Sequence, residues 1–80
     1  MINRESVVPP WQQLEDLLRE RIKNGELRRG ARIPSAAALA QEYELAPVTV
    51  RKAITQLQQE GLLVSRVGWG TYVAEQPPAT

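Results

Sequence analysis

The sequence predicts a mostly α-helical fold with a small β-hairpin, made of three helices followed by two strands. Apolar residues at helical spacing, from residue 11 and again from residue 47, indicate amphipathic helices. Only Glu44 to Ala46 separate the last helix from the one before it, which is the length of a helix-turn-helix corner. Two β-rich runs then flank Val67-Gly68-Trp69-Gly70, which is a hairpin signal. Together these elements form a winged helix-turn-helix.

The first helix is predicted over residues 11–24. Its apolar stripe is made of Trp11, Leu14, Leu17, Leu18 and Ile22. Asn24-Gly25 ends the pattern, and Pro9-Pro10 fits an extended arm before a helix start, since proline is tolerated in a helix's first turn. We therefore expect residues 1–9 to form a flexible N-terminal arm and Trp11 to begin the helix's core stripe.

A connector over residues 27–34 leads to the second helix. Within it, Arg32-Ile33 can pair as a short strand with the later hairpin. Ser35 supplies an N-cap oxygen for a helix from Ala36 to about Tyr43. Glu44 follows in the turn; if that position is left-handed, a glutamate there costs about 1 kcal/mol.

The third helix is predicted over residues 47–60, where Pro47 suits the first position because its missing amide hydrogen is not needed there. Its core stripe is Val50, Ala53, Ile54 and Leu57. The opposite face carries Thr49, Lys52, Thr55 and Gln56, with Arg51 at its edge. The hairpin strands are expected over 62–66 and 71–74. Residues 10–74 thus form one domain, and residues 75–80 have the composition of a tail or the start of a linker.

The composition argues against several classes of protein. The chain has no Cys and no His, so it lacks thiol nucleophiles, the common zinc ligands and the usual general base. We expect no enzyme activity, no metal and no cofactor. No apolar run approaches the roughly 20 residues that span a bilayer, and no signal peptide is evident, which indicates a cytoplasmic, nucleoid-associated protein. The chain is either a stand-alone reader or a segment cut from a longer regulator; if it is complete, the fold consumes its 80 residues and no small-molecule pocket of ordinary size is expected.

The charge pattern is more informative than the net charge. Ten Lys and Arg against nine Asp and Glu leave only +1, which is modest for a nucleic-acid binder. However, basic residues cluster on the elements expected to face DNA: Arg28, Arg29 and Arg32 in the connector, Arg51 and Lys52 in the third helix, and Arg66 in the hairpin. Since a major groove roughly 12 Å wide admits one helix, these elements favour binding to double-stranded DNA.

The order and spacing of four motifs resemble the N-terminal DNA-binding domain of GntR-type bacterial transcription regulators, over about residues 10–74. The motifs are Pro34-Ser35 with Leu39-Ala40, Thr49-Val50-Arg51, Glu60-Gly61-Leu62, and Gly68-x-Gly70-Thr71-Tyr72-Val73. The resemblance implies a winged helix-turn-helix that binds a pseudo-palindromic operator as a homodimer. It places the third helix in the major groove and the wing tip, residues 67–70, toward the minor groove.

The resemblance also implies which residues contact DNA. Together with the charge pattern it gives the candidate site Ser35, Pro47, Val48, Thr49, Arg51, Lys52, Arg66, Gly68, Trp69 and Gly70. The chain departs from the family at Ala37 and Pro47, where arginines are usual, and at Trp69, where a basic residue is frequent. Because Ala46, Pro47 and Val48 can meet thymine methyl groups, we expect a more T-rich half-site than that of the arginine-bearing relatives.

Two questions stay open at this level. The leading function is a transcriptional regulator that represses by blocking a promoter. The alternative is a winged-helix protein–protein interaction module, which the low net charge and the missing arginines favour. Trp69 likewise either folds back on the ribbon or lies in a dimer contact, as a structural residue, or it lies along the groove against sugar and base.

Overall fold

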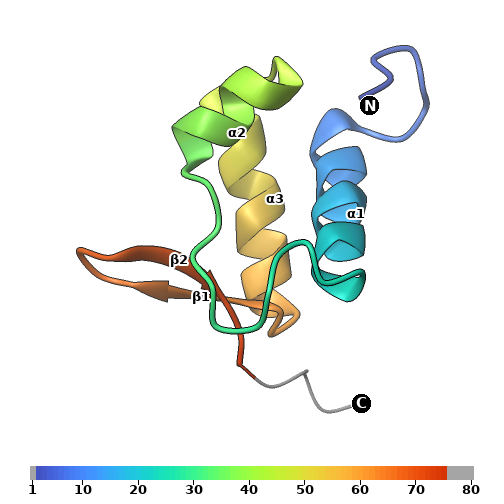
Figure 1. The fold of residues 1–80 in the computed structure, drawn as a ribbon. Coiled ribbons are helices and arrows are strands. Elements are labelled where there is room, and N and C mark those ends of the chain that lie inside the picture. The colour runs from blue at the N-terminus through green and yellow to red at the C-terminus, as the bar shows by residue number, and fades with distance from the viewer. Residues whose placement is uncertain (1, 76–80) are drawn as a thin grey trace.

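A computed structural model describes residues 2–75 and confirms the predicted fold class. Helices α1 (Pro10–Lys23), α2 (Ala36–Tyr43) and α3 (Pro47–Gln59) precede strands β1 (Leu63–Arg66) and β2 (Gly70–Val73). Figure 1 shows α1 and α3 side by side, with α2 crossing near the start of α3 and the hairpin projecting away from α1. In the described part, no helix is long and apolar enough to cross a membrane.

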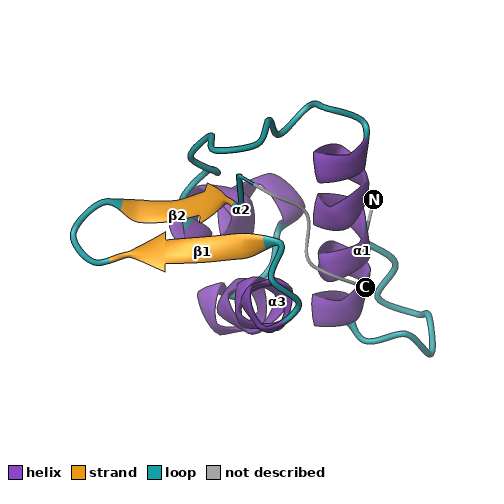
Figure 2. Cartoon of the chain, turned by 90° about the horizontal axis from the view of Figure 1, so that it is seen from below, coloured by secondary structure: helices purple, strands orange, loops and turns teal. Residues whose placement is uncertain are grey.

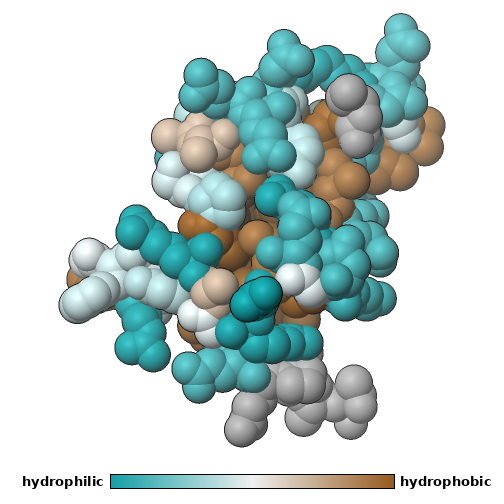
Figure 3. Space-filling view, in the orientation of Figure 1, coloured by the Kyte–Doolittle hydropathy of each residue, from teal (hydrophilic) through white to brown (hydrophobic). Residues whose placement is uncertain are grey.

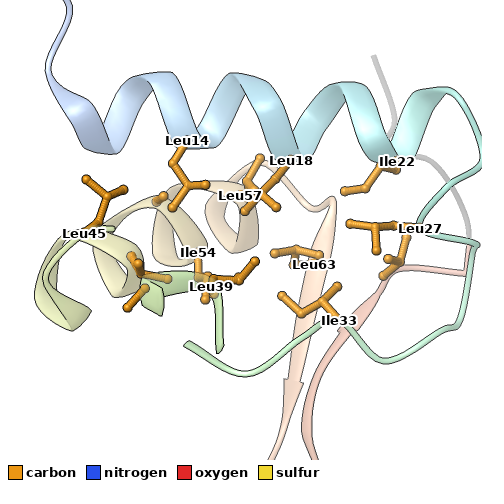
Figure 4. Close-up of a cluster of buried hydrophobic side chains, with 14 residues drawn as sticks. Leu14, Leu18, Ile22, Leu27, Ile33, Leu39, Leu45, Ile54, Leu57 and Leu63 are labelled. Atoms are coloured by element: carbon orange, nitrogen blue, oxygen red, sulfur yellow. The ribbon is translucent and has the colours of Figure 1, made fainter. Parts of the chain in front are cut away.

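One apolar core joins all five elements. Figure 4 shows Leu14, Leu18 and Ile22 pointing from α1 toward side chains of α3, the connector and the hairpin. The fully buried large side chains are Leu14, Leu18, Leu39, Leu57, Leu63, Val50 and Val73. The predicted stripe is wrong at its first position, because Trp11 is only half-buried and lies outside this cluster. Its indole ring contacts Lys52 of α3 instead.

The wing is an antiparallel hairpin with a third segment along one edge. Leu63 pairs with Val73 and Arg66 with Gly70, while the predicted pairing of the connector with the hairpin takes the form of a bridge from Arg32 to Tyr72. Three hydrogen bonds fix this edge: the Gly30 amide donates to the Val73 carbonyl and the Ile33 amide to the Thr71 carbonyl, both at 2.9 Å, and the Val73 amide donates to the Ala31 carbonyl at 2.8 Å. Figure 2 shows the hairpin tip clear of the helices. The connector thus anchors the wing from the side opposite β1.

The helix boundaries differ from the predicted ones by one residue at three ends. α1 begins at Pro10 and ends at Lys23, with Asn24 as its C-cap, and α3 ends at Gln59 with Glu60 as its C-cap. α2 matches its prediction at both ends because its cap is local: the Ser35 hydroxyl oxygen accepts a hydrogen bond from the Ala38 amide at 3.0 Å.

The expected N-terminal arm is not extended. Gln13 of α1 accepts a hydrogen bond from the Asn3 amide at 2.7 Å, and its own side-chain amide donates to the Asn3 and Val8 carbonyls, each at 2.7 Å. Ile2 packs against the core, and the Arg4 guanidinium donates to the Glu44 carbonyl. Residues 2–9 therefore fold back toward the helix-turn-helix corner. The predicted tail falls outside the described residues except for Glu75.

Glu44 adopts the left-handed conformation that the turn suggested, with φ 56° and ψ 47°. Because a side chain costs roughly 1 kcal/mol or more there and glycine does not, Glu44→Gly should raise the free energy of unfolding by up to about 1 kcal/mol. Urea unfolding measures this change. The matched control, Gln41→Gly inside α2, should lower it by about 1 kcal/mol. Equal losses in both variants would contradict strain at Glu44.

Candidate nucleic-acid interface

The start of α3 is an exposed, apolar helix turn. Ala46 is the N-cap and gives no side-chain hydrogen bond, and Pro47 occupies the first turn. Val48 is 66% exposed, so most of its apolar side chain is open to contact with a partner. Thr49 is half-buried, so it lies at the flank of the exposed face rather than at its centre. This turn can meet apolar groups on a partner.

The exposed face of α3 follows directly from its core stripe. Val50, Ala53, Ile54 and Leu57 point inward, and at 100° per residue the opposite side is left to solvent. Val48, Arg51, Lys52 and Thr55 are all exposed there. The described structure gives Arg51 no ion-pair partner. Its charge is therefore free to bind an anion.

A groove of about 350 Å³ separates α3 from the wing. Arg32 enters it from the connector, Arg51 and Thr55 from α3, and Thr71 from β2. Its remaining lining comes from Ile33, Pro34, Ser35, Ala36, Ile54, Gln58, Ser65 and Gly70. In Figure 3, hydrophobic atoms show in the middle of the face between the helices and the wing, bordered by hydrophilic side chains. The groove thus combines an apolar floor with two cations at its walls.

Arg32 belongs to this groove although it was not among the predicted site residues. Its guanidinium lies against the backbone of Gly70: a Cβ added there would stand 2.8 Å from the Arg32 Nε. Gly70 also has φ 115°, a conformation that side chains rarely adopt, so both its backbone and its missing side chain are needed. The predicted pairing of Arg32 with the hairpin was the signal that could have placed this residue in the site.

Ser35 lies at the mouth of the same groove, at the start of α2. Its side-chain oxygen accepts the capping hydrogen bond of α2, but the hydroxyl hydrogen remains able to donate outward. The Gln58 side-chain amide donates a hydrogen bond to the Ser65 hydroxyl, which joins α3 to the wing. The groove lining thus includes hydrogen-bond donors on Arg32, Ser35 and Arg51, which suits a ligand with acceptor oxygens.

The wing carries the other predicted residues on its outer face. Trp69 is 68% exposed and lines a shallow hollow of about 310 Å³ together with Val64, Arg66 and Tyr72. The Arg66 guanidinium lies 6.0 Å from the centre of the Tyr72 ring. Gly68 has φ 79° with open space around it. Strand alternation explains this arrangement, because the paired Ser65 and Thr71 face the groove.

The ten candidate residues therefore do not form one cluster. Ser35, Arg51 and Gly70 meet at the groove, whereas Arg66 and Trp69 lie on the outer face of the wing. Lys52 lies on the α1 side of α3, where its Nζ is 4.6 Å from the centre of the Trp11 ring. Pro47, Val48 and Thr49 form the first turn of α3, and Gly68 lies in the wing tip.

Acidic residues are concentrated away from the groove. Arg19 of α1 pairs with Glu15 at 2.5 Å, Asp16 at 2.7 Å and Glu60 at 2.8 Å. A hydrogen bond shared with Glu15 and hydrogen bonds from Arg19 lower the pKa of the Glu60 carboxyl, while burial and the same Glu60 contact raise the pKa of Glu15. Arg21 likewise binds Glu26 at 2.6 Å, with Glu42 at 3.7 Å. Five acidic residues thus gather around two arginines and none of them lines the groove, so the groove is more basic than the net charge of +1 suggests.

The sequence matches a known family over most of its length. The profile of "Bacterial regulatory proteins, gntR family" covers residues 10–73. The chain is 43% identical over 68 residues to the mannosyl-D-glycerate transport/metabolism system repressor MngR of Escherichia coli (strain K12). It is 38% identical over 74 residues to the HTH-type transcriptional repressor NagR of Bacillus subtilis (strain 168). These matches cover 85% and 92% of this chain but only 28% and 30% of the relatives, which are named as regulators rather than enzymes.

Solved structures match the fold as well. AraR(DBD) in complex with operator ORX1 is 34% identical, with a TM-score of 0.82 over 85% of this chain and 82% of that one. A transcriptional antiterminator from Listeria monocytogenes EGD-e is 29% identical, with a TM-score of 0.90 over all of this chain and 60% of that one. Both the sequence and the winged helix-turn-helix fold show that the chain belongs to the gntR family of bacterial regulatory proteins.

Proposed function

We propose that the chain binds specific sequences of double-stranded DNA and acts as a transcriptional regulator. The form of regulation that we propose is repression. The observation that carries this proposal is the groove beside α3, where Arg32 and Arg51 extend without carboxylate partners among residues 2–75. Guanidinium groups bind phosphates and guanine edges through paired hydrogen bonds. The operator complexes of AraR and the repressor names of MngR and NagR support the same function.

The elements fit the dimensions of a duplex. α3 inserts into the major groove through its exposed face, with Pro47 and Val48 leading and Arg51 behind them. The wing lies beside the helix, so its tip at residues 67–70 reaches toward the adjacent minor groove. Ser35 and Thr49 lie at the flanks, where they donate to the phosphate backbone. In this arrangement the face of the wing that lines the groove and the outer face that carries Trp69 contact different parts of the duplex.

The active unit that we propose is a homodimer on a pseudo-palindromic operator, in the bacterial cytoplasm at the nucleoid. A two-fold symmetric protein reads two half-sites about one helical turn apart. Dimer formation also stabilises the domain, because a single domain of residues 10–73 buries a smaller share of its surface than a larger domain does. Repression then results from occupying a promoter.

The proposal is tested by fluorescence anisotropy with a duplex selected from a random-sequence pool. Affinity should fall steeply as salt rises, because every neutralised phosphate releases counterions. A scrambled duplex should bind at least about a thousandfold more weakly. Salt-insensitive binding, or equal affinity for both duplexes, would instead favour a protein-docking module that uses the exposed Val64 and Trp69 on the outer face of the wing.

The exposed first turn of α3 predicts that thymine methyl groups contribute to affinity. Val48 is 66% exposed, so contact with a methyl group removes apolar surface from water on both sides. Replacing the thymine that faces this turn by deoxyuridine should weaken binding roughly fourfold, since one buried methyl is worth about 0.8 kcal/mol. In Val48→Ala the same replacement should have less effect. Selection of guanine opposite Pro47 would contradict this T-rich half-site.

A further inference from the structure

Lys52 and Arg51 leave α3 on different sides. Successive helix residues are rotated by about 100°, so these neighbours bracket the exposed face that carries Val48 and Thr55. Arg51 lines the groove beside the wing, whereas the Lys52 ammonium lies 4.6 Å from the centre of the Trp11 ring of α1. A helix with cations on both flanks can reach phosphates on both walls of a major groove.

The partner of Lys52 is a ring face rather than a carboxylate. A carboxylate would neutralise the ammonium and compete with phosphate, but an aromatic face attracts a cation without cancelling its charge. The nearest turn of α1 does carry acids, Glu15 and Asp16, but both of them form ion pairs with Arg19. Among the ion pairs of the described residues, none involves Lys52. The ammonium is therefore held in place while its charge stays available.

Trp11 is suited to a fixed platform. It is the second residue of α1, directly after Pro9 and Pro10, whose rings restrict the backbone. The Pro9 carbonyl accepts hydrogen bonds from the Gln12 and Gln13 amides, at 3.0 and 3.1 Å, which fixes this first turn. Trp11 is also only half-buried and is not used to fill the core. Its position is thus set by the backbone while one ring face remains free for Lys52.

We propose that Trp11 is a positioning residue for DNA binding: its ring holds the Lys52 ammonium, before DNA arrives, where it meets a backbone phosphate on the α1 side of α3. The inference rests on the proposed DNA-binding function. Lysine has many rotamers, and ordering a long side chain at an interface reduces affinity. A lysine already ordered by Trp11 avoids most of that loss.

The test is a double-mutant cycle on a duplex selected from a random-sequence pool, with salt series for every variant. Lys52→Met should reduce the slope of log affinity against log salt by about one phosphate contact. Trp11→Leu should weaken binding about two- to fivefold, the range of an exposed cation–π contact, and should have no effect in the Lys52→Met background. Trp11→Phe should retain most of the affinity. Circular dichroism establishes that each variant is folded at the assay temperature.

A direct readout comes from NMR of the free protein. The Lys52 ε-methylene protons should be shifted upfield by the indole ring and should return to ordinary positions in Trp11→Leu. If Trp11→Leu unfolds, Trp11→Met replaces it in the cycle, because methionine is large and adaptable but has no ring face for the ammonium. Equal losses from the Trp11 change with and without Lys52 would overturn the inference while leaving DNA binding intact. Absence of duplex binding by the parent chain would instead overturn the proposed function.

Discussion

Arg51→Ala should lower affinity for a selected duplex by about ten- to a hundredfold. Arg51 is exposed on α3, lines the groove beside the wing and has no ion-pair partner in the described structure. A bidentate arginine contact to a base contributes roughly 1–3 kcal/mol, and no other side chain in the first two turns of α3 can replace its paired donors. Fluorescence anisotropy at constant salt measures the loss.

Two variants sharpen this result. Arg51→Lys keeps the charge but not the planar pair of donors, so it should bind more weakly than the parent and with lower sequence discrimination. Lys23→Ala removes an exposed cation from the last turn of α1 and should leave affinity within about twofold. If Arg51→Ala binds like the parent, α3 does not read the duplex through this residue.

Leu57→Ala should lower the free energy of unfolding by about 2–5 kcal/mol. The Leu57 side chain is fully buried where α3 packs against α1, and its removal leaves a cavity in the centre of the core. A domain of this size has a total stability on the order of 4–12 kcal/mol, so the loss is a large share of it. Urea unfolding followed by circular dichroism measures the change.

The matched control is Val67→Ala, at a valine that is 100% exposed in the wing tip. Its unfolding midpoint should stay close to that of the parent, because no packed surface is lost. At low temperature, where both variants are folded, Leu57→Ala should bind DNA with much of the parent's affinity. If Leu57→Ala lowers the free energy of unfolding by less than about 1 kcal/mol, the core does not pack around this residue.

Local signals in the sequence were sufficient to predict the helices and the hairpin. Ser35 predicts the start of α2 because its hydroxyl acts within three residues, and Pro47 predicts the start of α3 in the same way. Glu44 occupies a turn position where the resembled family often has glycine, which raised a left-handed conformation as one possibility, and its φ of 56° lies in that region. A pairing of Arg32-Ile33 with the hairpin was also predicted, and the bridge from Arg32 to Tyr72 confirms it.

Contacts between segments that are distant in the chain could not be predicted from the sequence. The apolar spacing of α1 does not reveal its rotation against α3, so Trp11 was placed in the core instead of beneath Lys52. The folding back of residues 2–9 depends on Ile2 packing against the core and on Arg4 binding the Glu44 carbonyl 40 residues away, and no local pattern encodes such contacts. The groove position of Arg32 likewise depends on the close approach of Gly70.

Titration of the labelled protein with a selected duplex, followed by amide resonances, tests the central claim most directly. If α3 and the wing straddle DNA, the largest chemical-shift changes occur at Val48 to Lys52 and at Gly68 to Gly70, and the amide of Arg32 shows a somewhat smaller change. The far end of α1, around Lys23, stays unchanged. Shifts confined to the outer face of the wing, or none with DNA while a protein ligand moves these same resonances, would contradict the account.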